Sequence, residues 1–392
     1  MRVAIVAEFY PRAADPVLGV WAHRQAVAAR DAGADVRVLV LHRPLPPLAA
    51  LRGGPAGALR AAARAAAQPL RATLDGIPIA YVPFLAPPRP RSYGDWGRWA
   101  TPPLAVALRV LRRSFAYDVV HAHNAVPAGE AVRRSGVAAP LVVSVHGGDV
   151  YHTAARSARG AEAVRAALHR AQLVVANSAG IEQRCRALGA RATRVVRLGT
   201  DLPPRRERPY DDPTVVTTGH LVARKRHADV LRAIALLRDR HPRLRYLVIG
   251  DGPERESLRR LADELGIAAR VELTGQLAPA EALERTRRAM LLALPSTDEA
   301  FGMVYVEAMA GWLPAIGARG EPGPEEIAAA GGGMTLVGAG DVAALAEAID
   351  ALLRDERGLR AEGVRARATV EAAFSWSQCG AATVAAYEAA LA

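Results

Sequence analysis

Short apolar segments alternate with helical patterns along the whole chain, and this alternation restricts the fold more than any other feature of the sequence. Runs such as 3–9 (VAIVAEF) and 141–146 (LVVSVH) are apolar almost throughout, as expected for strands that are buried on both faces. Stretches rich in Ala, Leu and Arg lie between them, for example 20–32, and fit amphipathic helices. The pattern therefore predicts an α/β fold with a parallel sheet covered by helices on both faces.

The alternation runs twice, once in each half of the chain. Strands are expected at 3–9, 36–41, 77–82, 118–123, 141–146, 173–178 and 194–199, and then at 214–221, 245–250, 270–275, 289–296 and 314–318. Between the two series lies 202–213 (LPPRRERPYDDP), whose Pro and charged residues indicate an interdomain linker. We expect two Rossmann-like, doubly wound domains over 1–202 and 203–373, with a final helix at 374–392 that packs back on the first. Ligands bind beyond the carboxyl ends of such strands, so the loops of both halves would frame one cleft.

The positive charge is concentrated in one region. The chain has a net charge of +12, and 43–115 alone holds eleven Arg against two acids. No helix-turn-helix, zinc-finger or RNA-binding pattern accompanies this charge, so a nucleic-acid partner is not expected. An anionic membrane surface and an anionic acceptor both remain as interpretations. Part of the region, 59–74, fits an amphipathic helix, with a solvated surface helix as the plainer alternative.

The cysteines and the apolar runs bear on the compartment. Cys185 and Cys379 are far apart in the sequence and have no Cys-x-x-Cys context, which indicates reduced structural thiols. The N-terminus lacks the apolar stretch of a signal peptide, and no apolar run reaches about 20 residues. We expect a cytoplasmic protein that at most rests on the inner face of the membrane.

The segment 295–311 (PSTDEAFGMVYVEAMAG) carries two glutamates, Glu299 and Glu307, eight residues apart. A helix that begins near Gly302 would place Glu307 in its second turn and leave the first backbone N–H groups free for a phosphate or for sugar hydroxyls. Carboxylates would repel a diphosphate, but they accept hydrogen bonds strongly from ribose and hexose hydroxyls. Two ordinary surface glutamates are the alternative, and that alternative leaves the surrounding E-x-F-G-x-x-x-x-E-A-M-A-x-G pattern unexplained.

A second segment, 216–231 (VTTGHLVARKRHADVL), places Arg224, Lys225 and Arg226 between a strand and a helix. Cations at such a junction can neutralise a pyrophosphate. A charge run is usually a solvated loop. Lys225 is nevertheless the only lysine in a chain with fifty arginines, and this placement favours a binding role.

Taken in this order, the two segments resemble the C-terminal domain of the family 4 glycosyltransferases with the GT-B fold, which carries a G-x-L-x-x-x-K loop and then a Glu-x(7)-Glu motif. The segments VIGDGPERESL (248–258) and RLGTD (197–201) extend the resemblance. The resemblance implies that Lys225 contacts the donor pyrophosphate and that Glu307 accepts the ribose hydroxyls. It also implies that Glu299 holds hydroxyls of the transferred sugar.

The resemblance further implies that the backbone of Phe301, Gly302 and Met303 lies beside the sugar and the phosphates. This chain departs from the family pattern at His220, where an Arg is usual. Either His220 supplies a weaker, pH-dependent charge, or Arg224 takes over the phosphate contact.

Residues of the first half should complete the site. Gly19 lies between the first strand and a helix, where a glycine allows a phosphate to approach the backbone. His146 begins an H-G-G-D segment at the end of a strand, and in the family the corresponding His lies near the donor sugar. His121 could instead be a buried core histidine, and His123 is open to either interpretation. The motifs G-V-W-x-x-R-Q, H-A-H-x-x-x-P-A-G and H-G-G-D-V resemble bacterial members that act on cell-surface polysaccharides.

The expected reaction is a retaining, metal-independent transfer of a hexose from a nucleotide-diphosphate sugar, the co-substrate, to a hydroxyl of a glycan, a lipid-linked saccharide or a small metabolite. The chain contains no Asp-x-Asp, so we expect Lys225, neighbouring arginines and helix N-termini to stabilise the leaving diphosphate, without a metal or another cofactor. Neither Glu299 nor Glu307 is expected to act as a nucleophile. A sugar-nucleotide epimerase of the same fold and a non-catalytic nucleotide-sugar-binding protein are the alternatives.

Overall fold

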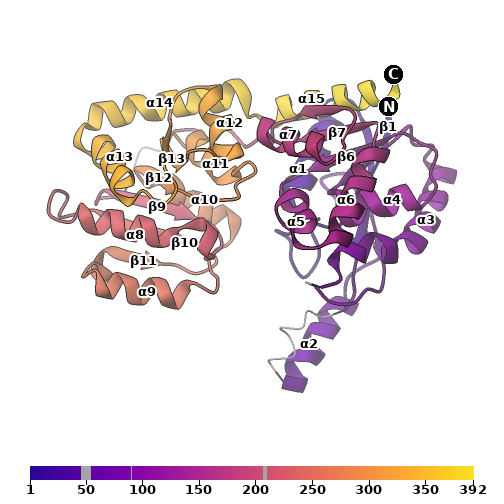
Figure 1. Ribbon diagram of the computed structural model, residues 1–392, viewed down its shortest axis with the longest axis horizontal. Helices are drawn as coiled ribbons and strands as arrows, with labels where there is room; N and C mark the ends of the chain where they lie inside the picture. Colours follow the sequence, from indigo (N-terminus) through magenta and orange to yellow (C-terminus); the bar gives the residue numbers. More distant parts are fainter. Residues whose placement is uncertain (46–53, 90, 206–209) are drawn as a thin grey trace. The chain divides into compact units, whose positions relative to one another are not determined.

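The structure, a computed structural model, describes residues 1–45, 54–89, 91–205 and 210–392. The chain forms two compact units (Figure 1). The N-terminal unit comprises Met1–Leu198 together with Trp376–Ala392, and the C-terminal unit comprises Gly199–Ser375. Four residues of the segment expected as a linker, 206–209, lie outside the described residues.

The N-terminal unit is built on an eight-stranded sheet with the order β3-β4-β2-β1-β5-β6-β7-β8. Its strands are β1 (Arg2–Ala7), β2 (Asp35–His42), β3 (Arg71–Leu74), β4 (Ile77–Pro83), β5 (Val119–His123), β6 (Leu141–Val145), β7 (Leu173–Ala176) and β8 (Thr193–Val195). Its helices are α1 (Val20–Asp31), α2 (Gly54–Ala66), α3 (Trp96–Ser114), α4 (Glu130–Arg134), α5 (Ala154–Arg156), α6 (Ala158–Arg170), α7 (Ala179–Ala187) and α15 (Trp376–Leu391). The residues of β5 and β6 are buried throughout, as their continuous apolar sequence predicts.

Two elements of this unit differ from the expected pattern. The strand β3 runs antiparallel to β4 and is joined to it through Asp75-Gly76, both with positive φ, as in a tight hairpin turn. The helix α3 continues through Pro102 and Pro103, although proline inside a helix removes a backbone hydrogen bond. The region 43–75 contains α2, which covers part of the helix expected over 59–74, and β3, and its residues 46–53 lie outside the described ranges.

The last helix of the chain, α15, packs on α1 of the N-terminal unit. The Gln25 side chain donates a hydrogen bond to the Thr383 hydroxyl at 3.0 Å, and Gly380 lies against the backbone of Ala28. The Tyr387 hydroxyl is 2.7 Å from Nδ1 of His121. Residues from both ends of the sequence therefore share one core.

The C-terminal unit has a six-stranded parallel sheet with the order β11-β10-β9-β12-β13-β14. Its strands are β9 (Thr214–Thr218), β10 (Arg245–Ile249), β11 (Val271–Leu273), β12 (Leu291–Leu294), β13 (Ala315–Ala318) and β14 (Met334–Val337). Its helices are α8 (His227–Leu236), α9 (Arg255–Glu264), α10 (Pro279–Arg287), α11 (Met303–Ala310), α12 (Pro322–Ala330), α13 (Val342–Arg354) and α14 (Glu356–Ala373). Counted within the unit, this is the strand order 3-2-1-4-5-6 of a doubly wound nucleotide-binding sheet.

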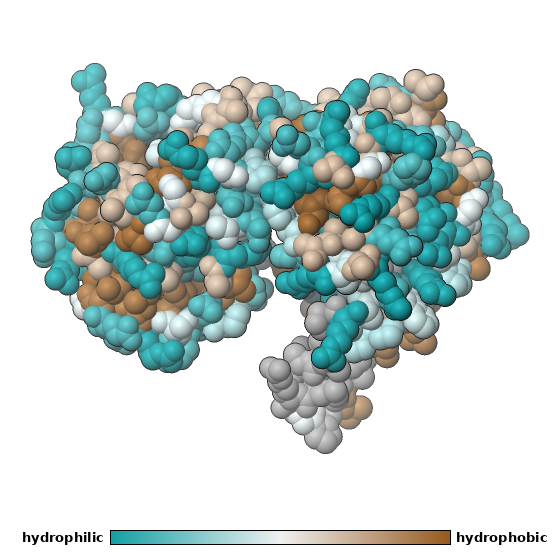
Figure 2. Space-filling view, viewed as in Figure 1, coloured by the Kyte–Doolittle hydropathy of each residue, from teal (hydrophilic) through white to brown (hydrophobic). Residues whose placement is uncertain are grey.

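The surface is mostly polar. Hydrophilic side chains cover most of the visible face of each unit, with smaller apolar patches among them (Figure 2). Among the described helices, none has the length and the apolar composition that crossing a bilayer requires. Cys185 and Cys379 are both buried and are not joined in a disulfide, and burial raises the pKa of the Cys185 thiol to about 12.

Candidate active site

The strand order of the C-terminal unit reverses between β9 and β12, and ligands of such sheets bind beyond the carboxyl ends of the two strands at this point. The segment after β9 contains a short helical turn, Ala223–Lys225. The segment after β12 contains Glu299. The topology therefore places both predicted donor-binding segments at the reversal point.

Lys225 and Glu299 are in direct contact there. Nζ of Lys225 lies 2.5 Å from Oε2 of Glu299, and each side chain is about nine-tenths buried. The Ser296 hydroxyl donates to the same oxygen at 2.9 Å, and the Glu299 backbone N–H donates to a carboxylate oxygen of Glu321 at 2.9 Å. A hydrogen bond of 2.8 Å from the Thr297 N–H to the Arg224 carbonyl joins the two segments.

These contacts leave groups free for a ligand. The Lys225 ammonium has three N–H donors, and Glu299 takes one of them. No described residue bonds the second carboxylate oxygen of Glu299, Oε1. The pair can therefore present both a donor and an acceptor to a ligand without breaking its own ion pair.

Phe301, Gly302 and Met303 form the start of α11. Gly302 has φ of 83°, and a Cβ on it would lie 2.4 Å from the ring of Tyr305 and 3.4 Å from Cγ of Glu299. Only glycine fits here, because both the backbone conformation and the neighbouring ring exclude a side chain. Gly302 thus brings the N-terminus of α11 next to Glu299.

Glu307 lies in the second turn of α11 and is half-buried. Burial raises the pKa of its carboxyl to about 7, Arg287 partly opposes this rise, and Asp201 adds slightly to it. A carboxyl group with this pKa changes its ionisation near neutral pH, which makes its hydrogen-bonding role dependent on pH.

The two candidates for the phosphate contact differ in their surroundings. His220 is exposed, and its carbonyl accepts a hydrogen bond from the Val222 N–H. Arg224 is half-buried, and its guanidinium forms no ion pair with the described residues. The neighbouring Arg226 instead pairs with Asp229 at 2.5 Å. Both candidates thus have side chains that are not committed to another charged group.

In the N-terminal unit, Gly19 has a packing role. It begins α1 with φ of 65°, and a Cβ on it would lie 2.1 Å from the carbonyl carbon of Phe9. The segment after β1 crosses directly over this glycine. Any larger residue would push that segment away from the start of α1.

His146 follows β6 and lies beside His123 at the end of β5. Nδ1 of His123 is 3.0 Å from Nε2 of His146, and burial lowers the pKa of His146 to about 4. His121 is a core residue that lies between the Tyr387 and Ser144 hydroxyls, 2.7 Å from each. Of the three histidines, His146 is the least buried.

Asp149 joins the two loops that follow β5 and β6. Its carboxylate accepts hydrogen bonds from the N–H groups of Ala125 and Val126 and from the Asn124 amide. Burial raises the pKa of this carboxyl to about 6, and the three hydrogen bonds limit the rise. Asp149 therefore ties the loop that follows β5 to the loop that carries His146.

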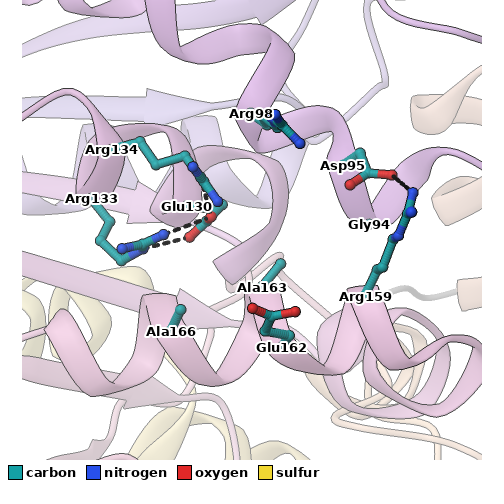
Figure 3. A pocket seen from close by; sticks show the side chains of 10 residues that line it. All are labelled: Gly94, Asp95, Arg98, Glu130, Arg133, Arg134, Arg159, Glu162, Ala163 and Ala166. Carbon is teal, nitrogen blue, oxygen red and sulfur yellow. Dashed lines mark hydrogen bonds and ion pairs between the residues drawn. The ribbon is translucent and has the colours of Figure 1, made fainter.

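A separate pocket of about 230 Å³ lies among α3, α4 and α6 (Figure 3). Arg133 and Arg134 both pair with the buried Glu130, and Arg159 faces Asp95 at 3.4 Å. Because these charges mostly satisfy one another, the pocket resembles a structural ion-pair network more than a catalytic centre.

Sequence reasoning did not single out several residues that shape these edges. Glu8, directly after β1, accepts hydrogen bonds from Arg89 at 2.5 Å and from the Tyr93 hydroxyl at 2.7 Å. In the C-terminal unit, Glu321 orients Glu299, and Arg287 moderates the pKa of Glu307. The one available signal was position, since Glu8 follows β1 directly and Glu321 lies in the short segment between β13 and α12.

Comparison with known proteins accounts for both units. The profile of the family "Glycosyl transferases group 1" matches residues 200–369, and that of the "Glycosyl transferase 4-like domain" matches residues 18–201. The chain belongs to the family 4 glycosyltransferases. Within the described residues of this family member, no group of three or more His, Cys, Asp or Glu side chains is arranged to hold a metal ion.

Curated relatives of this family 4 glycosyltransferase match part of the chain. An exopolysaccharide phosphotransferase of Streptomyces coelicolor is 37% identical over 46% of this chain and 19% of its own length. A GDP-mannose-dependent phosphatidylinositol monomannoside mannosyltransferase of Mycolicibacterium smegmatis is 33% identical over 44% of this chain and 46% of its own. A D-inositol 3-phosphate glycosyltransferase of Nocardia farcinica is 36% identical over 46% of this chain and 41% of its own length. The chain spans less than half the length of each of these relatives.

Solved structures show the same fold over nearly the whole of this chain. Sucrose-phosphate synthase of Thermosynechococcus elongatus superimposes with a TM-score of 0.78 at 21% identity, over 99% of this chain and 98% of its own. Anabaena HepE in complex with UDP-glucose gives a TM-score of 0.70 at 20% identity, over 98% of each chain. These likenesses confirm the expected GT-B fold with two Rossmann-like domains.

Proposed function

We propose that this protein is a retaining, metal-independent glycosyltransferase that transfers a hexose from a nucleotide-diphosphate sugar to a hydroxyl acceptor. The contact between Lys225 and Glu299 at the reversal point of the C-terminal sheet carries the proposal. It places a cation for a diphosphate next to a carboxylate for sugar hydroxyls, and a nucleotide-diphosphate sugar needs both at once.

Each residue then has a defined task. Lys225 donates its free N–H groups to the pyrophosphate, with Arg224 or His220 as the second cation. Oε1 of Glu299 accepts a hydroxyl of the transferred sugar, and the N-terminus of α11 at Gly302 and Met303 faces the phosphates. Glu307 accepts the ribose hydroxyls. In the N-terminal unit, Gly19 and His146 complete the contacts with the donor.

The reaction breaks one bond, forms another and transfers one proton. The bond between the anomeric carbon and the phosphate oxygen breaks, and the acceptor oxygen forms its bond to that carbon on the same face. The proton of the acceptor hydroxyl passes to the departing phosphate. The cations around Lys225 stabilise the negative charge that develops on the diphosphate, which is the function that a metal ion serves in other enzymes.

The acceptor is a glycan, a lipid-linked saccharide or a small metabolite, and the helix α3 favours the first two. Its exposed face carries three apolar side chains, Trp99, Val106 and Val110, each about half exposed. These positions share one side of the helix, since each residue turns it by about 100°. Three exposed arginines lie beside this stripe at positions 98, 109 and 113. Such a basic and apolar face fits the surface of an anionic bilayer, so we propose that the protein rests on the inner face of the membrane through 43–115.

A donor panel tests the function. Purified protein is incubated with nucleotide sugars in the presence of EDTA, beginning with GDP-mannose and UDP-glucose, the sugars named for the mannosyltransferase and for the HepE complex. Nucleotide release and the products are followed for the wild type, for Lys225→Ala and for Glu307→Gln. Arg357→Ala and Glu347→Gln are matched controls, because both side chains are exposed and lie on α14 and α13.

The expected result is metal-free nucleotide release with one donor, lost in both site variants and kept in both controls. An isomerised sugar nucleotide as the product would instead identify an epimerase, and tight binding without turnover, with an acceptor mixture present, would identify a binding protein. Activity that needs a divalent metal, or that survives both site substitutions, would contradict the proposed site.

A further inference from the structure

His123 and His146 form a hydrogen-bonded pair at the carboxyl ends of neighbouring strands. Their rings are parallel within 3°, with centroids 5.3 Å apart, and Nδ1 of His123 lies 3.0 Å from Nε2 of His146. The edge of Trp21 packs against the His146 ring, with centroids 6.2 Å apart. The rotation of the His146 ring is therefore restricted from two sides.

Among the residues that the structure describes, neither histidine has another hydrogen-bond partner. Nε2 of His123 and Nδ1 of His146 are both buried without a partner among the described residues. The ring of His121 lies beside that of His123, tilted by 36° with centroids 4.4 Å apart, but its own nitrogens lie against Tyr387 and Ser144. Buried polar atoms almost always have partners, so these two nitrogens are available to a water molecule or to a ligand hydroxyl.

The hydrogen bond between the rings couples their tautomers. Burial lowers the pKa of both imidazoles, so near neutral pH each ring is uncharged and carries one N–H. If His123 donates from Nδ1, its Nε2 is bare and the proton of His146 sits on Nδ1. If His146 donates from Nε2, its Nδ1 is bare and His123 carries its proton on Nε2. The two free nitrogens therefore always have opposite character.

We propose that His123 is a positioning residue that couples the tautomer of His146 to its own and holds the orientation of the His146 ring. This inference rests on the proposed function, in which His146 contacts the transferred sugar. A sugar hydroxyl at Nδ1 of His146 meets either a donor or an acceptor, and the tautomer of His123, coupled through the bond between the rings, determines which one. Without that bond both tautomers are populated, and only one of them matches the hydroxyl.

Two substitutions separate hydrogen bonding from packing. His123→Asn keeps a polar atom near the position of Nδ1, whereas His123→Leu removes it. We expect His123→Leu to lower kcat at least about tenfold while KM for the donor stays within about twofold, because the nucleotide contacts are unchanged. His123→Asn should recover most of the lost kcat. His121→Asn is the control for disturbing a neighbouring buried histidine. We expect this variant to lower the melting temperature while kcat changes little.

A readout that does not depend on activity comes from nitrogen NMR of ¹⁵N-histidine-labelled full-length protein, with His146→Gln used to assign the signals. Ring nitrogens that carry a proton are distinguished from bare ones by their chemical shifts. We expect one tautomer of His146 in the wild type and a mixture in His123→Leu. A mixture already present in the folded wild type would overturn the inference, even if a variant fails to fold.

The two proposals fail in different ways. If His146→Gln keeps the turnover of the wild type, the proposed contact with the sugar is wrong, and with it the functional part of the inference. If His146→Gln is inactive but His123→Leu is folded and fully active with an unchanged tautomer, the positioning role is refuted and the proposed function stands.

Discussion

Replacing Glu307 by Gln should change stability and donor binding in opposite ways as the pH rises. Burial raises the pKa of this carboxyl from 4.5 to about 7, so the folded protein holds a proton that the unfolded chain releases near pH 4.5. Between these two values the folded state binds more protons, and the free energy of unfolding of the wild type falls as the pH increases. Gln stays neutral at every pH, so the free energy of unfolding of Glu307→Gln does not fall in this way.

The size of the effect follows from the shift in pKa. One pKa unit corresponds to about 1.4 kcal/mol, so the shift amounts to about 3 kcal/mol. This value is an upper limit, because part of Glu307 still contacts solvent. Relative to wild type, the variant should gain up to about 3 kcal/mol at pH 8.5 and almost nothing at pH 4.5.

Binding of the donor nucleotide should respond in the other direction. If ionised Glu307 accepts the ribose hydroxyls, about a tenth of the protein is competent at pH 6 and about nine-tenths at pH 8. Wild-type affinity should therefore rise about tenfold over this range beyond the change seen in Glu307→Gln. The variant carries the same dependence on the nucleotide's own phosphate ionisation, and it thus supplies the baseline.

Urea unfolding at several pH values measures the stability, and calorimetry with the nucleotide identified in the donor panel measures the binding. Equal pH profiles of unfolding for the wild type and the variant would refute the raised pKa. A stability difference without a difference in binding would keep the buried carboxyl but would remove Glu307 from the nucleotide site.

Three further predictions concern other parts of the two units. Lys225→Ala should lower turnover by about a hundredfold or more, measured as nucleotide release at saturating donor, because the leaving diphosphate loses its nearest cation. Gly302→Ala should lower the free energy of unfolding by about 1–3 kcal/mol in urea, since a Cβ would meet the ring of Tyr305 and the positive φ disfavours alanine. The double variant Trp99→Ser, Val106→Ser should reduce sedimentation with vesicles rich in anionic lipid, and neutral vesicles should bind neither protein; equal sedimentation of both proteins with the anionic vesicles would exclude α3 as the membrane contact.

The sequence predicts the layout of the fold well where apolar runs are continuous. Strands β5, β6 and β12 are buried along their whole length, so their composition alone identifies them. The helix α3 escapes this reasoning because Pro102 and Pro103 interrupt its pattern, and the hairpin strand β3 is too short and too polar to stand out. In both cases packing within the N-terminal unit outweighs the local signal.

The sequence likewise predicts one part of the candidate site and not the other. The motif spacing is enough to nominate Lys225, Glu299 and Glu307 as a group. The spacing does not reveal the contacts among the site residues, because each contact joins segments that only the folded sheet brings together. These contacts are the pairing of Lys225 with Glu299, the hydrogen bond from Glu299 to Glu321 and the bond between His123 and His146. Strand order supplies the missing information, and sequence periodicity does not reveal strand order.

The packing of α15 on α1 has a consequence for synthesis of the protein. The ribosome releases the N-terminal sheet long before residues 376–392, yet these residues supply Thr383 for Gln25 and Tyr387 for His121. While the C-terminal unit is being translated, the nascent N-terminal unit exposes the groove that α15 later fills and leaves two buried polar groups without these partners. Domains generally fold in the order of their synthesis, but here the first to emerge must wait for the last helix. We therefore expect a ribosome-bound chain that stops before residue 376 to be captured by chaperones more readily than one that includes it.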